Sequence, residues 1–442
     1  SGRTLHGEER GEIVYPYSGP SSRYLEYGRA VPIKPFTEME DTPAFRSGLP
    51  HAARILEARL EAEKDSILET VASETGSPIA YHLEDLRGAC TFLRKLSRVG
   101  KLLPKKYLSE PKGNVLLILS ANEPIIVTTV LVLSALFVGN TVFLKSSSKT
   151  PSFGHFLVKE LTKIPLVKNK VHYLLTTRDE TERLIRAKSF DFVLSLGSRA
   201  ASRALTILCA ESEVEYLAEG EGNDWCYVDK KSESLEKISA IVVESFTRHN
   251  GQMCNAVRGV LVHADVFDAF MKNLKQRLLA VSVGSPRLYD SQIGALIEGT
   301  VPHAHALVSD GVQGAEDVWN YSESKGGTVM PPAVLVNPAE KSAIVSESIF
   351  APVLWVKTVK DHADALAFYQ RHNVHGLNFS IFSYDKKVAD HFVNRIRAGR
   401  IHINRHPLQT GPFEPLGGIL LSGHGGPRQW VEKFSNTKLI KK

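Results

Sequence analysis

The chain has 442 residues, which is enough for two or three domains that share substantial hydrophobic cores. Hydrophobic residues make up 43% and charged residues 23%, the composition of an ordinary globular protein rather than a fibrous or disordered one. The net charge of +6 is small for this length, and no basic block with interleaved aromatic residues occurs, so nucleic-acid binding has little support.

The four cysteines are far apart and form no Cys-x-x-Cys pair, which argues against a disulfide framework or a zinc site and fits a reducing, cytoplasmic location. The sixteen histidines are scattered, so no metal site is expected. The N-terminus is charged and polar, unlike a signal peptide. The longest apolar run, Ile125–Val138, is too short to span a bilayer and predicts a buried core helix, so no membrane partner is expected.

The first hundred residues predict a hairpin followed by helices. Residues 12–29 contain a strand-like run broken by a Ser-Gly-Pro turn, which favours a hairpin. From Ala52 to Ala72, apolar residues recur at three- and four-residue intervals, and Gly76 with Pro78 ends the predicted helix. A second amphipathic helix is predicted at Leu83–Leu96.

From residue 114 onward, apolar strands alternate with helices, which predicts a parallel sheet covered on both faces. The predicted strands are 114–119, 141–144, 171–175 and 190–194, and the predicted helices are 126–137, one from about 153, and 181–187. A second α/β region follows Asp229, with helices at 233–246 and 267–281 and strands at 257–262, 334–336, 353–356, 380–382 and 400–403. Ligands of such sheets bind outside the carboxyl ends of the strands.

The segment Phe246–Val262 carries the strongest candidate for a catalytic side chain. Cys254 follows a polar, Gly-containing stretch and precedes an apolar strand, where a thiol can be partly exposed near backbone N–H donors. A buried structural cysteine is the alternative. Gly-Gln-x-Cys followed by Arg258 resembles the catalytic-cysteine motif of the aldehyde dehydrogenase superfamily.

The resemblance covers about Glu12 to Leu439 and implies the α/β aldehyde dehydrogenase fold. That fold has a Rossmann-like cofactor domain, an α/β catalytic domain and a small bridging oligomerisation element, in a homodimer or homotetramer. The three parts would be residues 1–99 with 112–224, residues 225–429, and residues 100–111 with 430–442. The tail Lys433–Leu439 would add an edge strand at the interface between subunits.

Two further catalytic residues follow from the resemblance. Ser120–Pro124 is similar to the family's x-Asn-x-Pro loop, which would make Asn122 an oxyanion donor together with the backbone N–H of Cys254. Taken alone, Asn-x-Pro is usually a turn. Glu219 lies where hydrolytic members have the general base that activates water. Glu123, in contrast, stands where the family usually has an aromatic residue.

The loop after Glu219 points in two directions. Gly220-Glu-Gly222-Asn223 also resembles the Gly-x-Gly-Asn of CoA-acylating members, which lack the Glu and pass the acyl group to a thiol. A plain Gly-rich turn with solvated acids is the structural alternative.

Gly139–Pro151 looks like the family's adenosine-binding segment, in which Lys145 would reach the ribose. Where the NAD-preferring pattern has Glu, this chain has Ser148, followed by Lys149. The missing carboxylate at Ser148 and the neighbouring cation of Lys149 favour NADP over NAD, because a 2′-phosphate meets a positive charge there and no negative charge from residue 148.

The remaining cofactor residues follow from shorter motifs. Gly197 and Ser198 resemble the family's pyrophosphate turn, although Ser202 stands where a Gly is usual. Phe350 would pack on the nicotinamide side, and Ser348 replaces the Glu that usually holds the nicotinamide ribose. The complete cofactor set implied by the resemblance is Ser120, Lys145, Ser148, Gly197, Ser198, Gly220, Glu347 and Phe350.

The motifs together predict NAD(P)-dependent oxidation of an aldehyde to a carboxylic acid through a cysteine thiohemiacetal and thioester. Asn404-Arg405, Thr410-Gly411 and Gly423–Pro427 look most like the semialdehyde branch of glutamate-semialdehyde (pyrroline-carboxylate) dehydrogenases. One alternative is acyl-thioester chemistry with CoA or a carrier thiol, in either direction. Another is a non-catalytic member used for binding or assembly.

Overall fold

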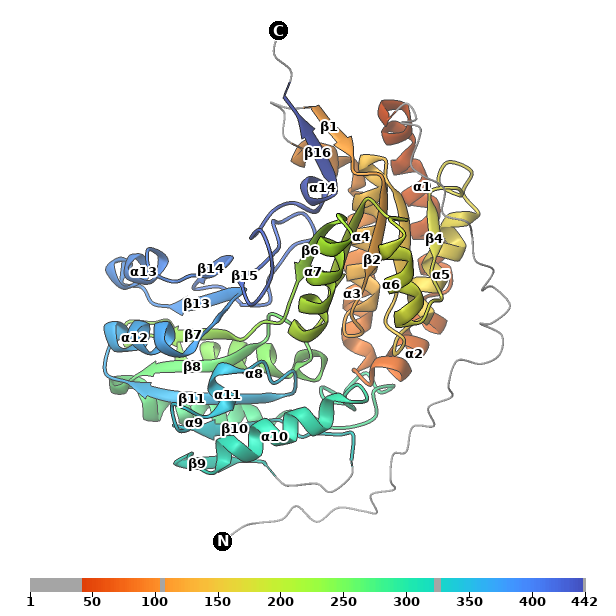
Figure 1. Ribbon diagram of the computed structural model, residues 1–442. Coiled ribbons are helices and arrows are strands. Elements are labelled where there is room, and N and C mark those ends of the chain that lie inside the picture. The colour runs from red at the N-terminus through yellow and green to blue at the C-terminus, as the bar shows by residue number, and fades with distance from the viewer. Residues whose placement is uncertain (1–41, 104–107, 322–326, 440–442) are drawn as a thin grey trace.

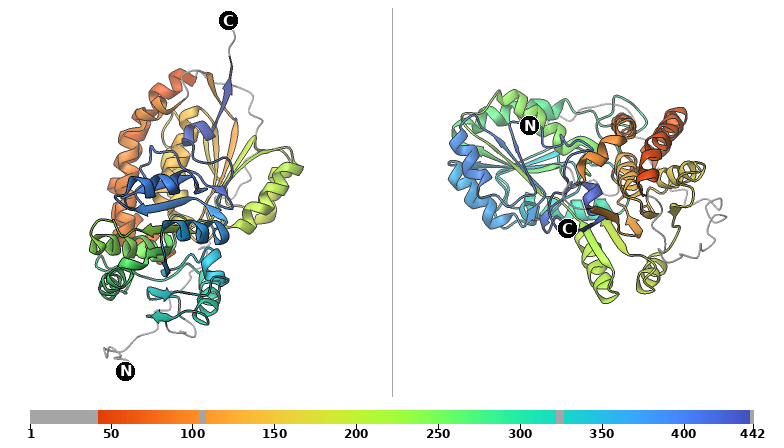
Figure 2. Two further views of the ribbon diagram at one scale, coloured as in Figure 1. Left: turned by 90° about the vertical axis from the view of Figure 1, so that its left-hand side faces the viewer. Right: turned by 90° about the horizontal axis from the view of Figure 1, so that it is seen from above.

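The computed structural model of the chain describes residues 42–103, 108–321 and 327–439 (Figure 1). The hairpin predicted at residues 12–29 lies outside this part. Two open sheets carry most of the strands, and each is flanked by helices (Figures 1 and 2). Among the described residues, no helix is both long and apolar enough to cross a membrane.

The first sheet has five parallel strands in the order β4-β3-β2-β5-β6. Their bounds are β2 Asn114–Ile118, β3 Thr141–Lys145, β4 Val171–Tyr173, β5 Phe192–Leu196 and β6 Glu215–Glu219. The surrounding helices are α1 Thr42–Ala62, α2 Lys64–Thr75, α3 Ile79–Arg94, η2 Leu96–Leu102, α4 Pro124–Val138, α5 Ser152–Thr162, α6 Arg178–Arg186 and α7 Arg199–Glu211. As predicted, α4 is a buried core helix that packs against α3 and α5.

The second sheet has seven strands in the order β14-β13-β7-β8-β11-β10-β9, and only β9 is antiparallel to its neighbour. The strands are β7 Asp224–Val228, β8 Val257–His263, β9 Asp317–Trp319, β10 Ala333–Val336, β11 Val353–Val359, β13 Asn378–Phe382 and β14 Arg400–Ile403. The helices are α8 Leu235–Thr247, η3 Arg248–Gly251, η4 Ala264–Val266, α9 Phe267–Leu279, α10 Thr300–Val312, α11 Ala343–Ser346, α12 His362–His372 and α13 Lys386–Val393.

Alternate residues of β7 fill two different cores, because side chains of a strand point to opposite faces. Trp225 and Tyr227 pack in one core, and Cys226 and Val228 pack in the other. This two-sided burial explains why the central strands are continuously apolar.

Two small ribbons complete the fold. Strand β1 (Leu108–Pro111) pairs antiparallel with β16 (Ser435–Lys438), which follows α14 (Trp430–Lys433), and β12 (His375–Gly376) pairs with β15 (Ile419–Leu420). The predicted tail strand therefore exists, but it begins after Lys433 and pairs within the same chain. The division into domains at residues 99, 111, 224 and 429 stays a prediction.

The structure corrects one predicted helix. Residues 52–72 are not continuous, because α1 ends at Ala62 and α2 begins at Lys64. The predicted stop holds, since Gly76 adopts a left-handed conformation (φ 68°) and donates its N–H to Ala72. Helices α7, α10, α12 and α13 and strands β6 and β7 were not predicted from the sequence.

Candidate active site

A cavity of about 920 Å³ opens where the carboxyl ends of β2, β5 and β6 approach the loop before β8. Eight of the eleven predicted site residues line it: Ser120, Asn122, Gly197, Ser198, Glu219, Gly220, Cys254 and Phe350. Lys145, Ser148 and Glu347 are not among the lining residues. Strand register explains part of this gathering, because Leu196 at the end of β5 pairs with Glu219 at the end of β6.

The turn before the cysteine has three consecutive left-handed residues, His249, Asn250 and Gly251 (φ 50°, 59° and 67°). Such a backbone is unfavourable for the two non-glycine residues and persists only when its surroundings hold it. The Asn250 amide donates to the carbonyls of Gly76 (3.0 Å) and Ala295 (2.6 Å) and accepts from the N–H of Gly294 (2.8 Å). The side chain of Asn250, directly before the Gly-Gln-x-Cys motif, therefore fixes the turn.

Arg258 holds the same loop from beneath. Its side chain is fully buried and donates to the carbonyls of Gly251 (2.6 Å), Met253 (3.0 Å) and Ala351 (2.9 Å). These charge-assisted hydrogen bonds connect the end of the turn, at Gly251 and Met253, to Ala351 in the segment before β11. Arg258 thus positions the loop that carries Cys254.

Cys254 is partly exposed, whereas the other three cysteines are buried. Burial, together with the nearby carboxylates of Glu123 and Asp224, raises the pKa of the Cys254 thiol to about 12. Arg400, which lines the cavity, acts in the opposite direction. The thiol is therefore protonated at neutral pH, and a nucleophilic step needs a group that removes its proton.

Two carboxylic groups near the thiol are themselves perturbed. Burial raises the pKa of Asp224 to about 7, against hydrogen bonds from the N–H (2.9 Å) and the side-chain amide (2.6 Å) of Asn378. Burial and the charge of Asp85 raise the pKa of Glu123 to about 7. Asn122, the predicted oxyanion donor, is buried on the cavity wall and points its amide to the Glu123 carboxylate at 3.4 Å.

Glu219 is buried at the end of β6 and forms an ion pair with Lys433. Its second oxygen accepts from the N–H of Gly418 at 3.2 Å. Burial raises the pKa of Glu219, and the Lys433 ammonium opposes that rise. A Cβ on Gly417 would lie 3.0 Å from the carboxylate, so glycine at this position leaves room for the ion pair.

The loop after Glu219 packs directly against the backbone of Cys254. A Cβ on Gly222 would lie 1.8 Å from the carbonyl oxygen of Cys254, so only glycine fits there. Asn223 is buried, donates to the carbonyl of Val345 (2.9 Å) and accepts from Trp225 (3.1 Å). Packing within the protein therefore accounts for both residues.

The predicted pyrophosphate turn is built as a helix N-terminus. Ser198 caps α7 by accepting from the N–H of Ala201, and a Cβ on Gly197 would meet no atom nearer than 4.0 Å. This open cradle beside free space suits an approaching phosphate. The Glu221 carboxylate accepts from the Arg199 N–H at 2.9 Å, so a bound phosphate would have to displace it.

The residues predicted to bind the adenosine lie outside the lining of the cavity. Lys145 donates to the carbonyl of Thr176 at 2.6 Å, and Ser148 is exposed. Lys149 forms an ion pair with Glu298, which is itself a lining residue. Phe350, which lies between α11 and β11, has a left-handed backbone (φ 51°) and lines the cavity.

The sequence profile of the aldehyde dehydrogenase family matches residues 46–440. The chain belongs to the aldehyde dehydrogenase family. This result confirms the predicted family and its α/β fold. It also confirms the predicted enzyme class, an oxidoreductase that oxidises aldehydes to acids with NAD or NADP.

Several members of the aldehyde dehydrogenase family are similar over nearly the whole chain. A succinate-semialdehyde dehydrogenase [NADP(+)] of Mycobacterium ulcerans is 24% identical over 97% of both chains. Vanillin dehydrogenase of Pseudomonas fluorescens is 26% identical, covering 88% of this chain and 84% of its own. The structure of lactaldehyde dehydrogenase from Escherichia coli is 20% identical, with a TM-score of 0.82 over 90% of this chain and 88% of that one.

Three residues of this aldehyde dehydrogenase site were not assigned a role from the sequence. Arg400 begins the predicted strand 400–403, yet nothing in the sequence showed that its guanidinium reaches the cavity near Cys254. Asp224 begins a buried strand, where an acid is unusual and could have been noticed. Lys433 lay in a segment expected to be an edge strand at the interface between subunits, but its side chain is buried against Glu219.

Proposed function

We propose that this aldehyde dehydrogenase hydrolyses its thioester intermediate with water, with Cys254 as nucleophile, Asn122 as oxyanion donor and Glu219 as general base. The observation that carries the proposal is that one cavity is lined by all three side chains. A small aldehyde entering this cavity meets the partly exposed thiol of Cys254.

In the first step the Cys254 sulfur adds to the carbonyl carbon of the aldehyde. The developing oxyanion is stabilised by donors held in place beforehand, which is the most effective form of charge stabilisation in such sites. Asn122 suits this role because it is buried and lines the cavity. The oxidised nicotinamide, when bound, supplies the hydride acceptor.

The thiol must lose its proton before it attacks. Its raised pKa means that proton removal is coupled to a nearby base rather than spontaneous. The Glu219 carboxylate is close enough to the thiol for its negative charge to raise the pKa of Cys254. Glu219 can therefore serve in both steps: it accepts the proton of Cys254, releases it to solvent in the cavity, and is ionised again before it accepts a proton from the attacking water.

Deacylation by water requires a positioned base, because water is a poor nucleophile at neutral pH. Glu219 is buried and lines the cavity, and the Lys433 ammonium lowers its pKa against the larger effect of burial. The Gly-x-Gly-Asn resemblance gives less support to a thiol acceptor than the sequence suggested, because internal packing already accounts for Gly222 and Asn223.

We further infer a preference for NADP and a semialdehyde substrate. Ser148 stands where the NAD-preferring pattern has a carboxylate, and Lys149 adds a cation beside it that pairs with Glu298. Several similar proteins are named as NADP-dependent succinate-semialdehyde dehydrogenases. A screen of cofactor reduction over succinate semialdehyde, vanillin and lactaldehyde, with each cofactor and with or without CoA, tests both inferences.

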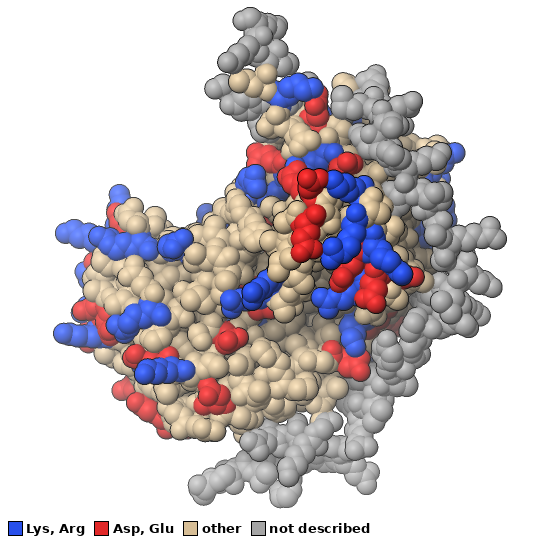
Figure 3. Space-filling model, in the orientation of Figure 1, with Lys and Arg blue, Asp and Glu red and all other residues tan. Residues whose placement is uncertain are grey.

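We also infer a cytoplasmic homo-oligomer that binds neither nucleic acid nor membrane. The four described cysteines are free, as in a reducing compartment. The β1–β16 ribbon ends in an exposed Leu439, which suits pairing with a second subunit. On the face in Figure 3, basic and acidic residues are interspersed, unlike a nucleic-acid site. Light scattering of the full chain measures the oligomeric state.

The decisive experiment for hydrolysis is Glu219→Gln. It should give one rapid burst of reduced cofactor, after which steady turnover is about a hundred- to ten-thousand-fold slower. An acyl adduct on Cys254 should then be visible by intact mass, and CoA should not restore turnover. Glu215→Gln, at the exposed start of the same strand, is the matched control and should turn over normally. Rescue by CoA, or a requirement for CoA in the unmodified enzyme, would refute hydrolysis.

A further inference from the structure

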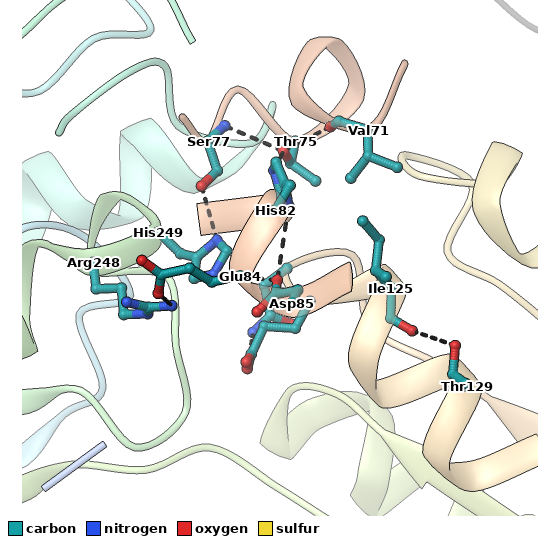
Figure 4. A network of polar contacts seen from close by, with 12 residues as sticks. Val71, Thr75, Ser77, His82, Glu84, Asp85, Ile125, Thr129, Arg248 and His249 are labelled. Atoms are coloured by element: carbon teal, nitrogen blue, oxygen red, sulfur yellow. Dashed lines mark hydrogen bonds and ion pairs between the residues drawn. The ribbon is translucent and has the colours of Figure 1, made fainter. Parts of the chain in front are cut away.

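A buried polar cluster lies beside the cavity and takes no part in the chemistry above. It consists of His82 and Asp85 on α3 and His249 on η3 (Figure 4). Their exposed fractions are 0%, 8% and 1%. The Asp85 Oδ2 atom lies 3.3 Å from His249 Nε2 and 3.8 Å from His82 Nδ1. His82 and Asp85 share one helix face because they are three residues apart.

The far side of each ring is held by a hydroxyl group. Thr75 donates its proton to the carbonyl of Val71 (2.8 Å), so its oxygen accepts from His82 Nε2, also at 2.8 Å. The neutral His82 ring then presents a lone pair at Nδ1, toward Asp85. Ser77 Oγ lies 2.8 Å from Nδ1 of His249. Metal-binding histidines are presented in this way, with the distal nitrogen hydrogen-bonded and the proximal one free.

The three facing atoms lack the partners that buried polar atoms need. Nδ1 of His82, Oδ2 of Asp85 and Nε2 of His249 are buried and have no hydrogen-bond partner. A nitrogen lone pair that faces a carboxylate oxygen repels it, and a buried charge without compensation is costly.

Arg248, which precedes His249 in the chain, is already paired with other carboxylates, and the charge of Asp85 acts on it from beyond ion-pair distance. Arg248 is engaged by Glu84 at 2.5 Å and by Glu244 at 3.8 Å. Among the described residues, Asp85 has ion-pair contacts only with the two histidines. Among the described residues, no lysine or arginine therefore lies within ion-pair distance of the Asp85 carboxylate, and a cation bound at the centre would balance its charge.

We propose that His82 Nδ1, Asp85 Oδ2 and His249 Nε2 bind one divalent transition-metal ion of the zinc type. Ligand distances of about 2.1 Å in a tetrahedron place ligand atoms about 3.4 Å apart. The three atoms already lie within 4.8 Å of one another, so a small closure completes the site. Two imidazoles and a carboxylate suit zinc, cobalt or iron and leave a position for water. Asp85 lines the cavity, which gives the ion a route of entry.

The ion would connect α3 to the turn that precedes the nucleophile. His249 belongs to the left-handed turn, five residues before Cys254. Metal binding would therefore stabilise the turn, in addition to Asn250 and Arg258. The spacing of the cysteines and the scatter of the histidines along the sequence predicted no metal site. The cluster joins residues 82, 85 and 249, which only the fold brings together.

The test uses the full chain with Cys254→Ala, so that the reactive thiol cannot bind metal. After dialysis against a chelator, Co²⁺ is titrated and its visible absorption is followed, and Zn²⁺ is then added in competition. One equivalent per chain should bind, zinc should displace cobalt, and the melting temperature should rise on loading. X-ray absorption at the zinc edge should report nitrogen and oxygen ligands without sulfur. Absence of a bound equivalent, or a sulfur ligand, would overturn the proposal.

Variants locate the site. Asp85→Asn keeps the side-chain shape and should weaken cobalt binding more than tenfold, as should His82→Gln. His303→Gln removes a histidine that lines the same cavity outside the cluster, and binding should not change. Undiminished binding in a folded Asp85→Asn chain would contradict the assignment. If the variants do not fold, the stoichiometry and ligand type of the Cys254→Ala chain decide by themselves.

Discussion

The loop that carries Cys254 and the predicted adenosine-binding segment are built differently. On the catalytic side, Cys254 sits on a loop that buried hydrogen bonds from Asn250 and Arg258 hold in place. On the adenosine side, Ser148 is exposed, and Lys149 forms a surface ion pair with Glu298. The first set of contacts is shielded from water, whereas the second is screened by it.

This difference separates two kinds of requirement. A nucleophile and its base must be held to a fraction of an ångström before the substrate arrives, which requires buried, fully satisfied partners. Cofactor discrimination depends on one phosphate at a solvent-exposed edge, where a change of charge alters affinity without disturbing the core. Substitutions on the catalytic side should therefore have large effects on rate or stability, and substitutions on the adenosine side small effects on affinity.

The largest effect is expected from Cys254→Ala, which removes the nucleophile. Turnover should be abolished, while folding and cofactor binding remain, because Cys254 makes none of the hydrogen bonds that fix its loop. In the unmodified chain, iodoacetamide should label Cys254 before Cys90, Cys209 or Cys226, which are all buried. Turnover that persists in Cys254→Ala would end the enzymatic interpretation.

Arg258→Lys tests whether the buried arginine holds the catalytic loop. Lysine cannot reach all three carbonyls, and each lost charge-assisted hydrogen bond costs about 1.5–3 kcal/mol. The free energy of unfolding should fall by about 3 kcal/mol, measured by urea denaturation. Arg178→Lys, an exposed residue paired with Glu182, is the control and should change it by about 0.5 kcal/mol at most. Equal effects in the two variants would contradict the positioning role.

Lys433→Met tests the electrostatic control of the proposed base. The Lys433 ammonium lowers the pKa of Glu219 against the effect of burial, so its removal should raise that pKa. Since the ionised carboxylate is the active form, the acidic limb of the pH profile for deacylation should move to higher pH. Lys438→Met, in the same tail but paired with the partly buried Glu110, should leave the limb in place. A limb that does not move would exclude Glu219 as the titrating base.

The sequence predicted the elements whose residues are local and periodic. The strands near residues 115, 141 and 257 and the buried helix α4 agree with their apolar patterns. The sequence did not predict partners that come from distant segments. Lys433 meets Glu219 across 214 residues, and His249 meets Ser77 across 172. No periodicity records such contacts, because they depend on how loops pack once both sheets have formed.

The smallest effect is expected at the adenosine edge, from Ser148→Glu. A new carboxylate near a 2′-phosphate adds repulsion of about 1 kcal/mol at a water-exposed site, or about fivefold in affinity. NADP binding should weaken by about this factor, and NAD, which has no 2′-phosphate, is the internal control. Fluorescence titration of both cofactors against both proteins gives the four dissociation constants. Lower salt should enlarge the difference, because the charges are exposed. Tighter binding of NAD than NADP by the unmodified chain would contradict the preference directly.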